Sequence, residues 1–123
     1  MGSRDRKEAG DRAERLALSH LLAAGLELVA QNYRCKAGEL DLVMLDGEIL
    51  TFVEVRFRRD ARFGGAAASV IHRKQRRLIK SAHHLLLMRP NLRRYAARFD
   101  VVAIENAADG ALKIDWIKDA FRI

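Results

Sequence analysis

The chain has 123 residues, half of them hydrophobic and one of them proline, and 23 Lys and Arg face 16 Asp and Glu. This composition excludes a disordered or fibrous chain and indicates one globular domain, expected over residues 1–123 with 1–8 flexible. No run approaches the ~20 apolar residues of a membrane span, and the charged N-terminal segment lacks a signal-peptide core. The single cysteine, Cys35, excludes an internal disulfide. We therefore expect a cytoplasmic protein that does not enter a membrane.

The first half of the sequence predicts one helix followed by three strands. Alanines and leucines recur at helical spacing over residues 9–24, and Gly25 ends this helix. Strands are expected over residues 26–34, 39–45 and 48–56. The dipeptide Asp46-Gly47 is a strong signal for a two-residue hairpin between the last two strands.

The second half predicts a charged surface loop over residues 57–68, a helix over 69–88 and two further strands near 98–104 and 111–117. Ser69 suits the N-cap of this helix, and Pro90 follows its end. The order is therefore αβββαββ. A helix between the third and fourth strands is the kind of connection that a parallel pair requires. We expect a single α/β domain with a central mixed sheet of about five strands, flanked by helices.

Positive charge is concentrated in the middle of the chain. Residues 56–98 contain thirteen Lys or Arg and one acid, Asp60. Such a segment attracts nucleic acid, because each contact with a phosphate releases a condensed counterion. A solvated basic surface would leave the same pattern. The candidate nucleic-acid-binding residues in this segment are Arg58, Arg59, Arg73, Arg76, Arg77 and Lys80.

Away from the turn, three carboxylates interrupt the apolar hairpin over residues 38–56, namely Glu39, Asp41 and Glu54. If Asp46 and Gly47 are the central residues of its turn, Glu39 lies opposite Glu54 and Asp41 is a diagonal neighbour of Glu54. Because alternate residues of a strand share a face, these three acids and Arg56 then project from one side of the sheet.

Buried carboxylates require a proton, a cationic partner or a metal ion. A cluster of oxygen ligands suits a hard divalent cation such as Mg²⁺ or Mn²⁺. Next to a basic segment, such a site would suit metal-assisted hydrolysis of a phosphodiester. The alternative is a buried salt bridge from Arg56 to Glu54 or Glu39.

Both helices offer further candidates. Glu14 shares a face of the first helix with Ala17 and Leu21, which makes it either a fourth site carboxylate or an exposed edge residue. Lys74 and Gln75 lie on or beside the inner stripe of the second helix. Lys74 would either approach the carboxylates or extend its ammonium to solvent.

The residues also resemble a known family. An acid in the first helix, then Asp41, then Glu54-Val55-Arg56 is similar to the P-D-(D/E)-x-K signature of nucleases. More specifically, the chain resembles the YraN-like family of small, largely uncharacterised bacterial proteins. The matching stretches are AER at 13–15, NYRCKAGELDLV at 32–43, FVEVR at 52–56, FGGAAASV at 63–70, KQRRL at 74–78, RFDVV at 98–102 and AF at 120–121.

This resemblance implies a restriction-endonuclease-like fold, related to that of archaeal Holliday-junction resolvases. In that likeness Asp41 and Glu54 are metal ligands, assisted by the backbone carbonyl of Val55. The first helix completes the site with Glu14 and Arg15, the latter a nucleic-acid contact, and the second helix contributes Lys74 or Gln75. The likeness also suggests a two-fold homodimer, which no stretch of the sequence specifies.

The chain departs from the signature at Arg56, where lysine is expected. Arginine keeps the charge but is planar, bulkier and always protonated, so it cannot accept a proton. The sequence therefore predicts a Mg²⁺- or Mn²⁺-dependent endonuclease acting on nucleic acid, DNA rather than RNA. The alternative is a catalytically impaired nucleic-acid-binding or assembly protein on the same fold. A third reading is a basic face that binds an acidic protein.

Overall fold

The computed structural model describes residues 3–58, 72–107 and 109–122. Within these ranges the elements are α1 (Ser3–Ala23), β1 (Glu27–Cys35), β2 (Gly38–Asp46), β3 (Ile49–Arg58), α2 (His72–Met88), the 3-10 helix η3 (Pro90–Arg94), β4 (Ala96–Asn106) and β5 (Leu112–Phe121). The predicted αβββαββ order is confirmed, with η3 as an addition. No helix in the described ranges is long and apolar enough to cross a membrane.

Two elements extend by four residues or more at one end beyond the sequence prediction. Helix α1 begins at Ser3 instead of residue 9, and β5 continues to Phe121 instead of 117. Residues 3–8 are all charged or polar, so hydrophobic periodicity gives no signal there although the segment is helical. Strand β5 has many exposed residues, which weakens its alternation. Arg59, Ser69 and residues 59–68 of the predicted loop lie outside the described residues.

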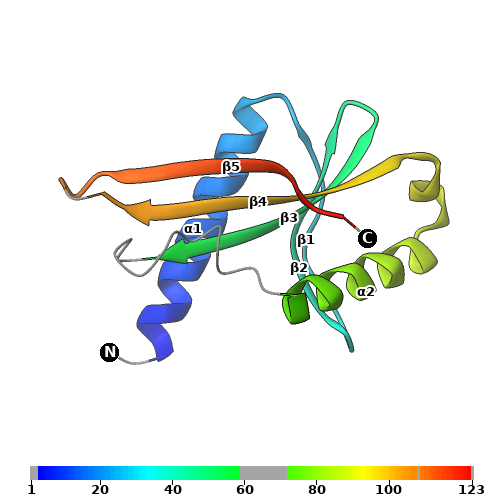
Figure 1. Ribbon diagram of the computed structural model, residues 1–123, viewed down its shortest axis with the longest axis horizontal. Helices are drawn as coiled ribbons and strands as arrows, with labels where there is room; N and C mark the ends of the chain where they lie inside the picture. The colour runs from blue at the N-terminus through cyan, green and yellow to red at the C-terminus, as the bar shows by residue number, and fades with distance from the viewer. Residues whose placement is uncertain (1–2, 59–71, 108, 123) are drawn as a thin grey trace.

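The described residues form a mixed α/β domain built on a five-stranded sheet in the order β1-β2-β3-β4-β5. Strands β3 and β4 are parallel, and the other three pairs are antiparallel. The α2 segment makes the crossover that the parallel pair requires. In Figure 1, α1 crosses behind β3 to β5, whereas α2 lies beside β1 and β2. The predicted mixed sheet with flanking helices is therefore confirmed.

Each helix covers a different face of the sheet, because successive strand residues point to opposite sides. Leu21 of α1 belongs to one buried cluster with Val53 of β3, whereas Leu85 of α2 belongs to a second with Phe52. The second cluster includes Phe99, which stacks on Phe52 at 5.2 Å between ring centroids. Both faces of the central strands β2, β3 and β4 are thus buried, and any charge inside these layers must be compensated.

The hairpin register differs from the prediction. Asp46 pairs with Ile49, so Gly47 and Glu48 are the central residues of the turn. Gly47 has φ of 62°, which fits the first central position of a type II′ turn, where glycine is preferred. The prediction that Asp46 is a central turn residue is therefore wrong, since Asp46 completes the ladder.

This correction moves each strand partner by two residues. Phe52 pairs with Val43, not Asp41, and the ladder runs to Leu42 and Val53, so the next position brings Asp41 opposite Glu54. The predicted pairing of Glu39 with Glu54 is wrong for the same reason. A shift of two residues leaves every side chain on its predicted face, because the side-chain period of a strand is two.

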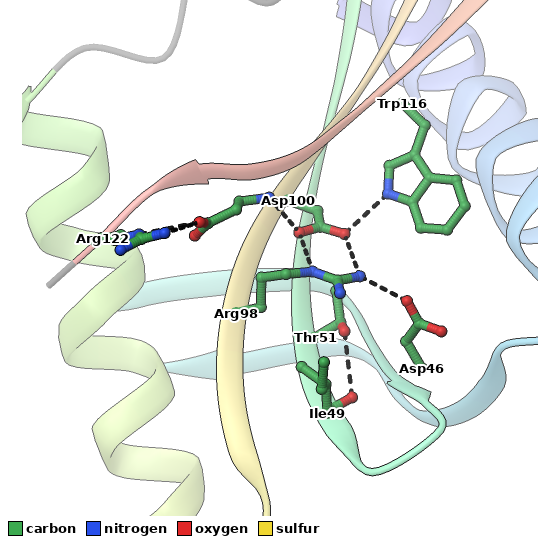
Figure 2. Close-up of polar contacts among 8 residues, drawn as sticks. Asp46, Ile49, Thr51, Arg98, Asp100, Trp116 and Arg122 are labelled. Atoms are coloured by element: carbon green, nitrogen blue, oxygen red, sulfur yellow. Dashed lines mark hydrogen bonds and ion pairs between the residues drawn. The ribbon is translucent and has the colours of Figure 1, made fainter.

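A buried polar network ties β5 to β4 (Figure 2). The fully buried carboxylate of Asp100 accepts bonds from Arg98 at 2.8 and 3.0 Å, from Trp116 Nε1 at 2.9 Å and from the backbone N–H of Asp119 at 2.9 Å. Arg98 also donates to Asp46 at 2.8 Å, and these carboxylates, Asp100 above all, raise the pKa of its guanidinium. The carboxylate of Asp100 therefore has a structural role in the sheet.

Candidate functional site

Three carboxylates converge where α1 passes the ends of β1 and β2. Glu14 of α1 and Glu39 and Asp41 of β2 each offer an oxygen, and these oxygens lie within 4.8 Å of one another. All three side chains are half-buried. The prediction placed Glu39 on the correct face but did not include it among the ligands. It enters the group because Glu14, from a distant part of the sequence, meets β2 at this point.

An amide from β1 bridges two of these acids. Asn32 Nδ2 donates to Glu14 Oε2 at 2.9 Å and to Glu39 Oε1 at 3.0 Å. Asn32 has φ of 52°, the left-handed region that asparagine tolerates better than most residues. Sequence reasoning missed Asn32, and the available signal was an asparagine inside a predicted strand, where this residue is depleted.

Glu54 is buried beside this group and carries its own cationic partners. Its side chain is 3 % exposed, and Oε1 lies 2.9 Å from Lys74 Nζ and 3.6 Å from Arg56 Nη1. The ion pair between Arg56 and Glu54, the alternative that the sequence left open, is therefore present. Lys74 is the closer partner, so its ammonium turns to the carboxylate although the side chain is 40 % exposed.

In the described part of the chain, the surroundings of Asp41 and Glu14 disfavour their charged forms. Burial and the nearby charge of Glu54 raise the pKa of Asp41 to about 8, while a 2.9 Å bond from the backbone N–H of Val55 opposes this rise. Burial also raises the pKa of Glu14, with Glu39 adding to the effect and the Asn32 amide opposing it. Such shifts are typical of clustered carboxylates that would gain from a bound cation.

The remaining predicted residues that the structure describes come from β3 and from both helices. Val55 gives its N–H to Asp41, and its carbonyl stays a predicted ligand. Gln75 is half-buried next to Lys74 on α2, and Arg15 is exposed next to Glu14 on α1. The exposed side of α2 carries Arg73, Arg76, Arg77 and Lys80. The side chain of Arg58, and all of Arg59, lie outside the described residues.

The donor set fits a hard divalent cation. Every candidate ligand is an oxygen, either of a carboxylate or of the Val55 carbonyl, which suits Mg²⁺ or Mn²⁺ and does not favour zinc. Lys74 and the guanidinium of Arg56 then border the acids with positive charge, as a site for a phosphate would require. Chemically, the arrangement is suited to bind a cation and a phosphodiester side by side.

Comparison with known proteins gives one consistent result. Residues 13–104 match the uncharacterised protein family UPF0102. A UPF0102 protein of Pseudomonas savastanoi is 48 % identical over 116 residues, which cover 94 % of each chain. One from Pseudomonas entomophila is 49 % identical over 92 % of each chain, and one from Saccharophagus degradans is 47 % identical over 94 % of each. These matches span the AER, GELDLV, FVEVR and RFDVV stretches.

Proposed function

We propose a function from the premise that this chain belongs to the uncharacterised protein family UPF0102, which agrees with the YraN-like resemblance. The protein is a cytoplasmic Mg²⁺- or Mn²⁺-dependent endonuclease that hydrolyses phosphodiester bonds in DNA or structured nucleic acid. Its fold is restriction-endonuclease-like and related to that of archaeal Holliday-junction resolvases. The observation that carries this proposal is the convergence of Glu14, Glu39 and Asp41 beside the buried Glu54.

The acids would hold the cation. Mg²⁺ prefers oxygen ligands and keeps several waters, so a few carboxylates together with a substrate phosphate satisfy it. Asp41 and Glu54 come from adjacent strands, and Glu14 and Glu39 are held at hydrogen-bond distance from the Asn32 amide. A bound divalent cation supplies stabilisation of the negative charge that develops on the reacting phosphate.

Lys74 takes the role that the missing lysine at position 56 would have. Its ammonium lies nearer to Glu54 than the guanidinium of Arg56 does, at 2.9 Å against 3.6 Å. An ammonium is a compact donor whose pKa responds to its surroundings, so it orients a water molecule or neutralises a phosphate oxygen. Arg56 keeps its charge in every state and holds Glu54 and the substrate phosphate in place.

The test is cleavage of branched and linear DNA with Mg²⁺ or Mn²⁺. Asp41→Asn and Glu54→Gln should each reduce cleavage by at least ~100-fold, as removal of groups that stabilise a transition state does. Asp115→Asn, an exposed acid of β5, is the matched control and should cleave like the parent. Circular dichroism verifies folding. Unchanged cleavage by folded Asp41→Asn and Glu54→Gln proteins would disprove the proposal.

A second function is favoured by Arg56 itself. The residue occupies the signature lysine position and forms an ion pair with Glu54, so the protein would bind nucleic acid without cutting it. In that case the parent protein binds DNA, no divalent ion yields product, and Arg56→Lys gains cleavage. Assembly as a two-fold homodimer belongs to the same proposal, and analytical ultracentrifugation tests it.

A further inference from the structure

A cleft separates the turn between β1 and β2 from helix α2. It has a volume of about 610 Å³ and is lined by residues 35–37 together with Lys80, His83, His84 and Leu87. Cys35, one of the lining residues, has its Sγ 3.6 Å from Ser81 Oγ, and this contact ties the end of β1 to the helix. The turn depends on Gly38, whose φ of 150° would strain any other residue.

The positive charge of this cleft favours a negatively charged ligand. Lys36 lines the cleft from the turn and Lys80 from the helix, and the imidazoles of His83 and His84 line it as well. Among its lining residues, all of them in the described part of the chain, there is no carboxylate. Like charges on facing elements repel, so an anion seated between them would relieve this repulsion.

His84 adds a directed donor. Its Nδ1 lies at hydrogen-bond distance from the hydroxyl of Tyr33 on β1. When the phenol donates to Nδ1, the ring proton lies on Nε2, which then acts as a donor. The Tyr33 contact thus allows an imidazole whose Nε2 donates to an oxygen anion.

Helix α2 connects the cleft with the acidic site, which is the group of Glu14, Glu39 and Asp41 together with Glu54. Arg73, Arg77, Lys80 and His84 follow one another at intervals of four, three and four residues, so these exposed side chains lie on one face of the helix. At a rise of about 1.5 Å per residue this basic stripe is about 16 Å long. It begins beside Lys74, the partner of Glu54, and ends in the cleft.

We propose that this cleft is a second subsite for the sugar-phosphate backbone of a nucleic acid, occupied by phosphates several nucleotides away from the bond at the acidic site. One strand of a duplex carries a phosphate for each ~3.4 Å of axis, so a stripe of about 16 Å spans roughly five phosphates. Lys36 and Lys80 contact the backbone, and the apolar part of the cleft, with Ala37 and Leu87, contacts a sugar. This inference rests on the proposed function.

The experiment measures binding of a fluorescently labelled DNA duplex in the presence of a chelator, over a series of salt concentrations. The double variant Lys36→Gln/Lys80→Gln is compared with Lys7→Gln/Lys113→Gln, which removes two exposed lysines from α1 and β5 and thus the same net charge. Loss of two phosphate contacts should reduce the slope of log K against log salt by ~1.8 and weaken binding by roughly tenfold or more. The control double variant should stay close to the parent.

A third variant, Lys36→Arg/Lys80→Arg, keeps both charges and should retain the salt slope of the parent. Equal losses in the two glutamine variants would mean that net charge alone matters, and this result overturns the subsite. Unchanged binding by Lys36→Gln/Lys80→Gln overturns it as well. If the parent protein binds no DNA at low salt, the proposed function fails instead, so the two failures are distinguishable.

Discussion

Two groups of carboxylates in this protein have opposite surroundings. Asp100, in the network between β4 and β5, is fully buried and accepts bonds from a guanidinium, an indole and a backbone N–H. Asp41, in the acidic group, has one backbone bond and further carboxylates as neighbours, and its pKa is raised. A fully compensated carboxylate holds a fold together, whereas a cluster in which acids outnumber their cationic partners gains stability from a proton or a bound cation. The difference separates the structural acids from the candidate site.

The largest expected effect is the loss of folding stability when Asp100, the compensated carboxylate, is replaced. Asp100→Asn should destabilise the protein by about 3–5 kcal/mol, because Arg98 loses its buried counter-charge. Since small domains are stable by only about 5–15 kcal/mol, this is a large fraction. Urea denaturation measures the loss. The exposed Asp115→Asn is the control and should change little, and an equally mild effect of Asp100→Asn would remove the contrast with Asp41.

The second effect concerns a bound cation. At a concentration about 100-fold above its dissociation constant, Mg²⁺ or Mn²⁺ should stabilise the parent protein by about 2.7 kcal/mol, because the ion binds the folded state. Glu39→Gln and Asp41→Asn should lose most of this gain, whereas Asp100→Asn should keep it. Thermal melting with and without the ion is the measurement. An equal gain in stability in Asp41→Asn would show that the ion binds at some other site.

The third effect is a pH dependence with opposite sign to that of an ordinary salt bridge. The pKa of Asp41 rises from 3.8 to about 8 on folding, so the folded carboxyl keeps a proton that the unfolded one has released. Its contribution to stability is therefore complete below pH 3.8 and is lost as the pH rises through about 8. The slope is at most about 1.4 kcal/mol per pH unit.

Asp41→Asn should remove this slope, and the variant should be more stable than the parent at the alkaline end when a chelator is present. Denaturant titrations across this pH range measure it. If Asp41→Asn and the parent lose stability in parallel as the pH rises, the slope belongs to other groups and the comparison with Asp100 weakens.

The smallest effect separates backbone strain from side-chain bonding at Asn32. Asn32→Gly removes the amide that joins Glu14 to Glu39 but tolerates the φ of 52°. Asn32→Ala removes the same amide and adds backbone strain at this φ, so it should be less stable than Asn32→Gly by about 1 kcal/mol. Both variants should weaken the response to Mn²⁺ equally. A cation response that is retained in Asn32→Gly would show that the bridge does not position the acids.

The candidate site was partly predictable. Alternation along β2 and β3 indicates that Asp41 and Glu54 share a face, and this survives a two-residue error in the register because the strand period is two. The turn chemistry was ambiguous, since Asp46-Gly47 and Gly47-Glu48 both offer a glycine at a central position. Glu39 lay on the predicted face, but its place in the ligand group depends on Glu14 of α1. Local periodicity carries no information about which residues of α1 lie against β2.

The sequence by itself determined the element order, the two apolar faces of the sheet and the gathering of acids on the hairpin, because these follow from hydrophobic period and turn residues. Tertiary structure alone decided which charges meet. It brought Lys74 to Glu54, Trp116 to Asp100 and Lys36 to the cleft beside Lys80. These contacts join residues far apart in the chain, and their energies depend on distance and burial, which no local pattern encodes.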